Sequence, residues 1–533
     1  MRYRPHHILP FLCLLFVQTL FAQPELIIPR PASMTALGED PVPLGKEIRY
    51  DTAFAAQAAY LRDLLKQQFG EELATTGMAG KAGIRLSMDP SIKNPEAYRL
   101  EASGKQGIVL AASGIKGIVN GIQTLIQLLP MNRTGMLQVP AVRIEDYPRF
   151  AYRGMHLDVV RHFFPVDYIK KYIDYLAFHK FNSFHWHLTD DQGWRIEMKS
   201  YPRLNEIGSW REETLIGHFK DEPARYDGTR YGGYYTREEI KDVLAYAAVR
   251  GINIIPEIDI PGHSRAIIAS YPELSTRPDT TWKVATTWGM YNRQNNVLAP
   301  RPETFVFLRT VFHEIADLFP SEYIHVGGDE CSKLWWKQDP FTQQFMKQKG
   351  LKNEAALQTY FIETVAGYLA EKNKKTIGWH EVMEGELDKN TVVMNWATEK
   401  TAVAAAKKGY RVIMTPGKPL YFDHYQSSQP GDSLAIHGYN SLEAVYRFDP
   451  VPASLKPSEA SAILGAQANV WTEYMAYPSK VDYMIFPRMT ALSEALWTPA
   501  DKKDYDDFLE RINRNMIPRY RLWNSSYYTE AGR

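Results

Sequence analysis

Short apolar runs alternate with helical patterns along most of the chain. Eight runs of the kind that form buried strands follow residue 150, and apolar residues at helical spacing fill most of the intervals between them. The runs span 154–160, 181–188, 252–260, 323–326, 376–378, 391–395, 411–414 and 463–470. Strands that alternate with helices pair in parallel, and eight of them close into a barrel. The pattern therefore predicts a (β/α)8 TIM barrel over residues 150–533, ending in a helix with apolar positions Phe508, Ile512 and Met516.

The chain before the barrel has a mixed pattern. Apolar residues at helical spacing occupy 60–69 and 115–129, and strand-like runs cover 83–86, 98–100 and 108–110. No cluster of chemically active side chains accompanies them. We therefore expect residues 23–149 to form a small α/β domain in front of the barrel, which places the whole protein in the α/β class.

The first 22 residues differ from everything that follows. Arg2 and Arg4 precede an apolar run at 8–21, and Ala22 closes it. A basic start, a short apolar segment and a small residue at its end are typical of a secretory signal peptide. We expect cleavage after Ala22 and export, to the periplasm or out of the cell. No later stretch has the roughly 18 apolar residues that a spanning helix needs, so no membrane span is expected in the mature chain.

The amino-acid composition limits the kinds of binding partner that the chain is expected to have. The chain carries 62 Lys and Arg against 61 Asp and Glu, and neither sign dominates a long stretch, so a nucleic-acid partner is not expected. Aromatic residues make up 13% of the chain, which suits stacking on sugar rings as well as ordinary cores. Cys331 is the only cysteine after the signal peptide, so the mature chain cannot close an internal disulfide. The oligomeric state stays open.

Residues unsuited to a core follow each apolar run. Active sites of this fold lie at the C-terminal ends of the strands, so these side chains are predicted to meet in one pocket. Tryptophans at three different strand ends indicate an apolar-walled pocket with a few polar anchors. In the order of the runs, the residues are Arg161; Asp190 and Asp191; Asp259 and His263; Asp329 and Glu330; Trp379; Trp396; Tyr421 and Asp423; and Trp471 and Glu473.

The sequence His-Val-Gly-Gly-Asp-Glu at 325–330 is the sharpest chemical signal. The two glycines allow a tight turn and a close approach of the backbone to a ligand. The adjacent Asp329 and Glu330 point in different directions at a strand end, so one can donate a proton while the other stays ionised. The alternative is structural, because acidic residues also stabilise the first turn of a helix.

Two histidines leave a metal-dependent reaction open. His185 and His187 lie two residues apart on one face of a strand, a spacing that can serve a metal ion. Asp190, Asp191 and His263 could complete such a site. The structural alternative is that both imidazoles are hydrogen-bonded and line the barrel. A glycan-binding protein without catalysis is a third hypothesis, but it would be expected to lack the Asp-Glu pair.

Several motifs together resemble one known family. The segments GMHLDVVRH (154–162), HWHLTDDQGWR (185–195) and QANVWTE (467–473), with the Pro-Gly-His turn at 261–263 and Gly-Gly-Asp-Glu at 327–330, are similar to those of the β-N-acetylhexosaminidases of glycoside hydrolase family 20, in the family's order. The resemblance covers most of the mature chain, including the domain before the barrel. It implies an exo-acting, retaining enzyme without a metal or other cofactor, and a glycan substrate that ends in β-linked GlcNAc or GalNAc.

The resemblance also implies how each group acts. In this family the substrate's own 2-acetamido group attacks the anomeric carbon. Glu330 corresponds to the general acid/base, and Asp329 to the carboxylate that orients the acetamido group. Asp190 and His263 correspond to a relay behind Glu330, with Asp191 as the alternative to Asp190. The expected substrate-binding residues are Tyr421 on the acetamido oxygen, Trp379, Trp396 and Trp471 around the methyl group and the sugar face, and Arg161, Asp423 and Glu473 on sugar hydroxyls.

Overall fold

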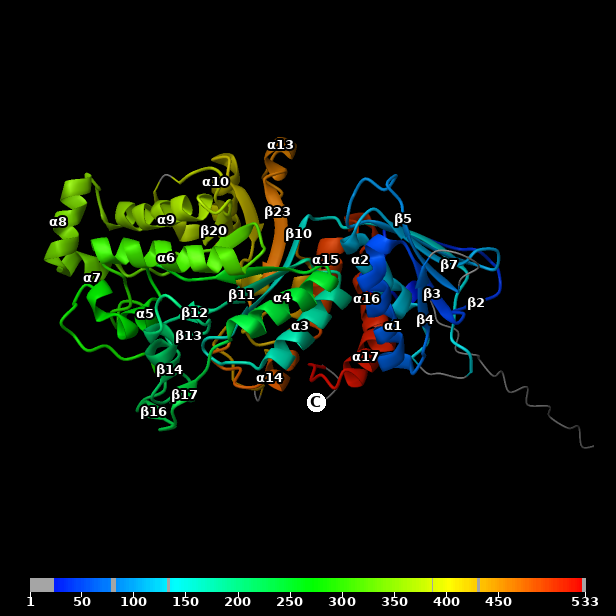
Figure 1. Ribbon diagram of the computed structural model, residues 1–533, viewed down its shortest axis with the longest axis horizontal. Coiled ribbons are helices and arrows are strands. Elements are labelled where there is room, and N and C mark those ends of the chain that lie inside the picture. Colours follow the sequence, from blue (N-terminus) through cyan, green and yellow to red (C-terminus); the bar gives the residue numbers. More distant parts are fainter. Residues whose placement is uncertain (1–23, 78–82, 132–134, 386, 429–431, 530–533) are drawn as a thin grey trace, which may run out of the picture.

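The computed structural model describes residues 24–529, except for 78–82, 132–134, 386 and 429–431. The predicted signal peptide lies outside these residues. The chain folds into a β-sheet with two covering helices, followed by a barrel of parallel strands wrapped in helices (Figure 1). Within the described residues, no helix is both long and apolar enough to cross a membrane.

The first part of the chain is built on a seven-stranded mixed sheet. Its order is β1-β9-β6-β7-β5-β3-β4, and α1 (Ala55–Phe69) and α2 (Ile115–Gln127) pack on it. The sequence pattern located α1, α2 and three of these strands, and missed the others. The strands are β1 (Ser33–Ala36), β3 (Glu47–Tyr50), β4 (Ala74–Gly77), β5 (Ile84–Met88), β6 (Tyr98–Ser103), β7 (Gly107–Ala112) and β9 (Val142–Asp146).

The second part is a closed barrel of eight parallel strands, which confirms the predicted (β/α)8 fold. Every one of the eight apolar runs overlaps one barrel strand. Apolar side chains, among them Tyr152, Ile255, Ile377 and Met394, fill much of the interior. The strands are β10 (Tyr152–Asp158), β11 (Ser183–His187), β18 (Asn253–Glu257), β19 (Tyr323–His325), β20 (Lys375–Trp379), β21 (Val392–Asn395), β22 (Arg411–Met414) and β23 (Ile463–Ala468).

Helices surround this barrel where the periodicity places them. Helix α4 begins with a capping box in which Thr236 and Glu239 bond each other's backbone N–H groups, a strong local start signal. The long outer helices are α3 (Val166–Phe178), α4 (Arg237–Val249), α6 (Pro302–Leu318) and α9 (Glu354–Ala370). The others that cover the barrel include α5 (Arg265–Ser270), α7 (Lys333–Gln338), α8 (Pro340–Lys349), α10 (Glu399–Lys407), α12 (Leu442–Arg447), α14 (Pro478–Ile485) and α15 (Arg488–Trp497).

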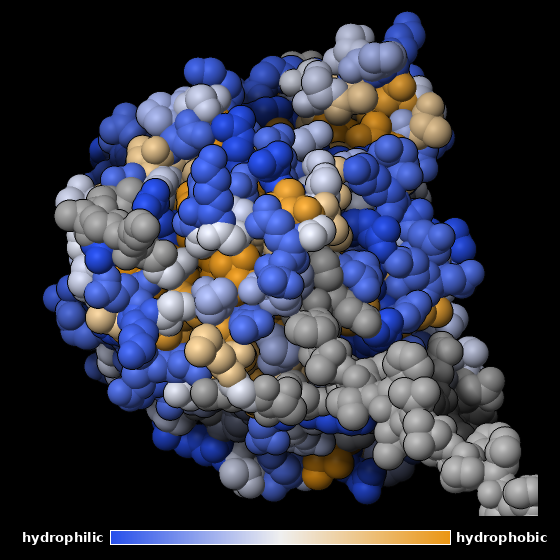
Figure 2. Space-filling view, turned by 90° about the vertical axis from the view of Figure 1, so that its right-hand side faces the viewer, coloured by the Kyte–Doolittle hydropathy of each residue, from blue (hydrophilic) through white to orange (hydrophobic). Residues whose placement is uncertain are grey.

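The C-terminal segment ties the two parts together. The predicted terminal helix is present as α16 (Tyr505–Arg511), a π-helical turn (Ile512–Met516) and α17 (Ile517–Leu522). Figure 1 shows α16 and α17 next to α1 and α2, between the sheet and the barrel. Buried side chains anchor them: Arg511 lies 2.8 Å from Glu494 of α15, and Asn515 donates to Gln127 of α2. The face in Figure 2 is mostly hydrophilic, with hydrophobic residues only in small separate groups.

Candidate active site

A cleft of about 1000 Å³ opens at the carboxyl ends of the barrel strands. Segments that follow six of the eight strands contribute to its wall, as expected for this fold. Nine of the twelve side chains to which the family resemblance assigns a role line it, namely Arg161, His263, Asp329, Glu330, Trp396, Tyr421, Asp423, Trp471 and Glu473. The other three, Asp190, Asp191 and Trp379, are buried behind the wall.

The turn after β19 brings the two adjacent acidic residues to the cleft. Gly327 and Gly328 both have positive φ, at 67° and 92°. A Cβ atom on Gly327 would lie 1.7 Å from Oδ1 of Asp259, so only glycine fits there. Glu330 itself has φ of 42°, a strained value for a residue with a side chain. The glycines therefore permit the turn, and the strain at Glu330 falls on a residue that faces the cleft.

His263 stands between the two acidic residues and the buried aspartates. Its Nε2 lies 3.8 Å from Asp329 Oδ2 and 3.7 Å from Glu330 Oε2. Its Nδ1 lies 3.0 Å from Asp190 Oδ1 and 3.2 Å from Asp191 Oδ2. Burial alone would lower the pKa of His263, but the Asp190 charge and the hydrogen bonds to both aspartates raise it well above its usual range. The imidazole is therefore a cation that faces Asp329 and Glu330.

Asp190 and Asp191 support His263 in different ways. Asp190 also forms an ion pair with Arg161, with Oδ2 and Nη2 2.8 Å apart, and lies 2.9 Å from His187 Nε2. Asp191 instead accepts hydrogen bonds from the Asn296 side chain and from the backbone N–H of residue 265. Asp190 therefore links His263 to other charged groups, whereas Asp191 fixes the surrounding loops.

The two acidic residues of the turn lie in different environments. The Asp329 side chain is 14% exposed and that of Glu330 is 48% exposed. Burial raises the pKa of Asp329 to about 7; the His263 cation opposes the rise, and Glu381, Glu257 and Glu330 add to it. Asp329 therefore ionises near neutral pH. Environments that differ in this way let neighbouring carboxyl groups take separate roles.

Asp259 is a further acidic side chain beside Asp329. Burial, together with the charge of Asp329, raises the pKa of Asp259 well above its usual range. Its Oδ1 accepts the backbone N–H of Gly328, 3.1 Å away, and so fixes the turn that carries Asp329. We had noted Asp259 as a strand-end residue from the sequence but assigned it no role.

Three acidic residues of the cleft wall each have one carboxyl oxygen left unpaired. Asp329 Oδ1, Asp423 Oδ1 and Glu473 Oε2 are buried and have no hydrogen-bond partner among the described residues. Buried acceptors are nearly always hydrogen-bonded, so each of these oxygens can take a further donor. Burial raises the pKa of both Asp423 and Glu473, and Arg161 counteracts the rise. Hydroxyl and amide groups are donors that such carboxyl groups accept.

Aromatic rings form the apolar part of the wall. Trp396 and Trp471 line the cleft on either side of Tyr421, whose ring centroid is 6.4 Å from that of Trp396 and 6.5 Å from that of Trp471. The buried Trp379 packs behind Trp471, with ring centroids 6.0 Å apart, and donates its indole N–H to Glu257 Oε1. The Trp471 ring also stacks under the Arg161 guanidinium, 5.2 Å from its centroid.

The histidine pair that suggested a metal lies below the cleft. His185 and His187 are fully buried and neither lines the cleft. Both ring nitrogens of His187 face carboxylates, those of Asp190 and Glu257, and His185 Nδ1 accepts from Gln467. A catalytic metal needs a coordination position open to substrate, which these buried imidazoles do not provide. Glu257 lies within the apolar run at 252–260, and the sequence pattern gives it no role.

The fold and the cleft define a carbohydrate-active hydrolase, because acidic oxygens without partners and tryptophan rings line one pocket at the mouth of the barrel. Comparison with protein families narrows this class. Residues 150–500 match the glycosyl hydrolase family 20 catalytic domain, and residues 25–147 match glycosyl hydrolase family 20, domain 2. The chain belongs to glycoside hydrolase family 20.

Similar proteins are named as enzymes that act on N-acetylhexosamine glycosides. The chain is 42% identical over 460 residues to a β-hexosaminidase of Porphyromonas gingivalis; the match covers 85% of this chain but only 56% of that enzyme's length. It is 39% identical to a β-hexosaminidase of Vibrio furnissii, over 88% of this chain and 76% of that one. The exo β-N-acetylglucosaminidase of Vibrio harveyi, solved with N-acetylglucosamine, superposes with a TM-score of 0.84 at 34% identity, covering 96% of this chain and 79% of that chain. This chain is a glycosidase of the β-N-acetylhexosaminidase type.

Proposed function

We propose that the protein releases terminal, non-reducing β-linked GlcNAc or GalNAc from glycans, with retention of anomeric configuration, by substrate-assisted catalysis. The observation that carries this proposal is the buried, unpaired Oδ1 of Asp329 next to Glu330, with His263 facing both carboxyl groups. The 2-acetamido N–H of such a sugar supplies the donor that this oxygen lacks. No metal takes part in the proposed reaction.

Glu330 is the proposed general acid/base. Its half-exposed carboxyl group lies at the cleft, where it reaches both the leaving-group oxygen and the incoming water. Protonating the leaving oxygen allows the glycosidic bond to break, and the same carboxylate then takes a proton from water. The cationic His263 stabilises Glu330 after it has given up its proton, because the imidazolium faces its carboxylate.

Asp329 is the proposed partner of the acetamido group. As the acetamido oxygen attacks the anomeric carbon, positive charge develops on the acetamido nitrogen and carbon of the oxazolinium intermediate. A carboxylate that accepts the N–H stabilises this charge more in the transition state than in the substrate, which raises turnover. An attacking group within the substrate also gains a large effective concentration, so the enzyme only has to position it.

The remaining wall residues bind the sugar. In this proposal Tyr421 donates to the acetamido oxygen, and Trp396 and Trp471, with Trp379 behind Trp471, enclose the acetamido methyl group; their positions in and behind the cleft wall support this. Arg161, Asp423 and Glu473 offer a cation and two acceptors for sugar hydroxyls. A cleft at the barrel mouth with these polar and aromatic partners is suited to a terminal sugar, which supports exo-action.

The test uses aryl glycosides. We expect the protein to hydrolyse aryl β-GlcNAc and β-GalNAc, to release the β-anomer first as seen by proton NMR, and to keep its full rate in EDTA. A thiazoline analogue of the oxazolinium intermediate should inhibit it far more tightly than product. Loss of activity in EDTA, or release of the α-anomer, would contradict the proposal.

We also propose that the protein is exported. The basic start and apolar run of the first 22 residues support this. Expression of the full sequence should yield mature protein outside the cytoplasm whose N-terminus is Gln23. Full-length protein retained in the cytoplasm would refute the proposal.

A further inference from the structure

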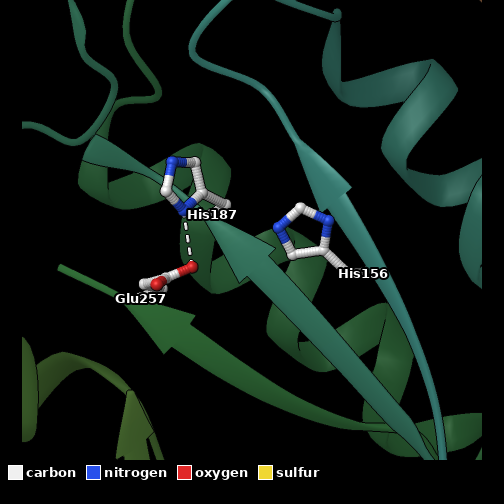
Figure 3. Close-up of side chains that lie close together, drawn as sticks. All are labelled: His156, His187 and Glu257. Atoms are coloured by element: carbon white, nitrogen blue, oxygen red, sulfur yellow. Dashed lines mark hydrogen bonds and ion pairs between the residues drawn. The ribbon is translucent and has the colours of Figure 1, made fainter. Parts of the chain in front are cut away.

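A chain of charged side chains continues behind the proposed acid/base, deeper into the barrel. It runs from His263 through Asp190 to His187, at the end of β11, and on to Glu257, at the end of β18. His187 Nε2 lies 2.9 Å from Asp190 Oδ2, and His187 Nδ1 lies 2.5 Å from Glu257 Oε2. Figure 3 shows the His187 ring turned toward Glu257. All four side chains are buried.

The geometry fixes the charge of His187. Each of its ring nitrogens faces a carboxylate oxygen, and ionised carboxylates only accept hydrogen bonds. Both nitrogens must therefore carry a proton, which makes the ring a cation. Burial would lower the pKa of His187, but the charge of Glu257 and the hydrogen bonds to Asp190 and Glu257 raise it to about 10. The charges along the chain thus alternate from Glu257 to His263.

Other contacts hold the two ends of the chain in place. Glu257 Oε1 accepts the indole N–H of Trp379 at 2.8 Å, and Glu257 Oε2 lies 3.0 Å from His185 Nε2. Asp190 Oδ2 contacts His187 and Arg161. Asp190 Oδ1 contacts His263 and accepts a backbone N–H. Because every oxygen is engaged, neither carboxylate can rotate without losing a partner.

The other titratable groups that interact with His187 and Glu257 include three imidazoles and two acidic side chains, Asp259 and Asp329, whose pKa values the charge of Glu257 raises. His156 of β10, His185 of β11 and His325 of β19 pack against the pair. Burial lowers the pKa of His156 well below its usual range and that of His185 to about 4, so both are neutral. His156 lies beside His187, with ring centroids 5.7 Å apart (Figure 3). Its Nδ1 accepts a hydrogen bond from the backbone N–H of Val470, which follows β23.

We propose that Glu257 and His187 are positioning residues of the reaction, which fix the orientation of Asp190 and the charge of His263 and thereby strengthen Glu330 as an acid. This inference rests on the proposed function for its kinetic consequence, but the charge of His187 can be measured without substrate.

Glu257→Gln is the decisive variant. Glutamine keeps the volume and can still accept from Trp379, while its amide donates to His187 Nδ1. His187 then becomes neutral and still donates to Asp190 through Nε2. The hydrogen bonds to Trp379 and His187 are kept and the charges are removed, whereas His185 Nε2, which faces Oε2 of the carboxylate, faces the amide N–H group instead. The matched control is His156→Asn, which changes a buried imidazole of the same layer that touches Trp471 but bonds neither Glu257 nor Asp190.

The first readout is NMR of protein labelled with ¹⁵N-histidine, with the His187 signal assigned by its loss in His187→Gln. We expect a doubly protonated His187 from pH 6 to 8 in the wild type and in His156→Asn, and a neutral ring in Glu257→Gln. A neutral His187 in the wild type would overturn the inference. A metal ion bound to either nitrogen would also show as a missing ring proton and would overturn it.

The second readout is kinetic. In Glu257→Gln, kcat on a substrate with a poor leaving group should fall about 10-fold, by comparison with carboxylates that orient metal-binding histidines, and less on one with a good leaving group. The alkaline limb of kcat/KM should move up by about half a pH unit, because the cation next to Asp190 is lost and Glu330 becomes a weaker acid. His156→Asn should leave this limb in place.

The possible results distinguish a failure of this inference from a failure of the proposed function. The inference would be overturned if the alkaline limb of kcat/KM did not move in Glu257→Gln. It would also be overturned if Glu257→Gln and His156→Asn showed the same kinetic change at equal Tm, because Glu257 would then only support the fold. A wild type that hydrolyses no N-acetylhexosaminide would refute the proposed function instead, and the NMR signal of His187 would still decide whether the charged chain exists.

Discussion

The replacement of Asp329 by Asn tests the electrostatic part of the mechanism. Asparagine keeps the shape of the side chain but removes the charge, and it can turn an N–H donor toward the acetamido N–H. The Asp329 side chain is only 14% exposed, and its Oδ1 has no hydrogen-bond partner among the described residues. Loss of the Asp329 charge should therefore destabilise the transition state, in which positive charge develops on the acetamido group.

The magnitude follows from the distance and the environment. A unit charge about 4 Å from a developing charge contributes roughly 4 kcal/mol at an effective dielectric constant near 20. Removal of one preorganised oxyanion-hole donor costs a similar amount, about 2.7–4 kcal/mol, or 100- to 1000-fold in kcat. We expect Asp329→Asn to lower kcat by at least about 100-fold, while KM changes much less, because the charge is absent from the bound substrate.

The assay compares turnover with binding of the intermediate's mimic. Steady-state kinetics on an aryl β-GlcNAc gives kcat and KM, and inhibition by the thiazoline gives its affinity. Both kcat and thiazoline affinity should fall in parallel. If the variant lost turnover but bound the thiazoline as tightly as the wild type, Asp329 would not be the acetamido partner, and the roles of the acidic pair would have to be reassigned.

The remaining predictions concern the acid, the substrate and the pH profile. Glu330→Gln should lower turnover of oligosaccharides by about 10²- to 10⁴-fold and turnover of an aryl substrate with a good leaving group much less; equal losses would remove Glu330 from the acid role. An aryl β-glucoside lacks the acetamido group and should be a very poor substrate, and kcat/KM near that of the N-acetylglucosaminide would contradict the mechanism. Since Asp329 acts ionised and its pKa is raised to about 7, kcat/KM should rise with pH up to that region. Glu381→Gln removes an acidic neighbour that raises this pKa, so it should move the acid limb to lower pH; a limb that stays in place would show that another group sets it.

Much of the barrel was predictable because its strands are buried on both faces. Such strands read as continuous apolar runs, and each of the eight is visible as a run followed by polar residues. The sheet in front of the barrel was harder to predict. Strands such as β4 are short and half exposed, and their partners lie far away in sequence, so a single chain carries little signal for the pairing.

The active site also contains residues that the sequence predicts and residues that it does not. Residues after the strands, such as Glu330 and Trp471, were visible because polar and aromatic side chains there break an apolar run. Glu257 and Asp259 were given no role because both lie near the end of the run at 252–260, where a carboxylate looks like part of the turn. Their function depends on contacts with His187 and Gly328, which come from other strands. The partner of His263 was also open, since Asp190 and Asp191 are adjacent in the chain and both lie within hydrogen-bonding distance.

The central claim is that the substrate's own acetamido oxygen is the nucleophile. The most direct measurement is kcat/KM for a series of aryl β-glucosaminides whose N-acyl methyl group carries none, one, two or three fluorine atoms. Fluorine withdraws electrons from the acyl oxygen and weakens it as a nucleophile, while the leaving group and the contacts of Glu330 stay the same. The account predicts a steep, continuous fall of kcat/KM along the series. Rates that stay level would contradict it and would require a nucleophile from the protein or from water.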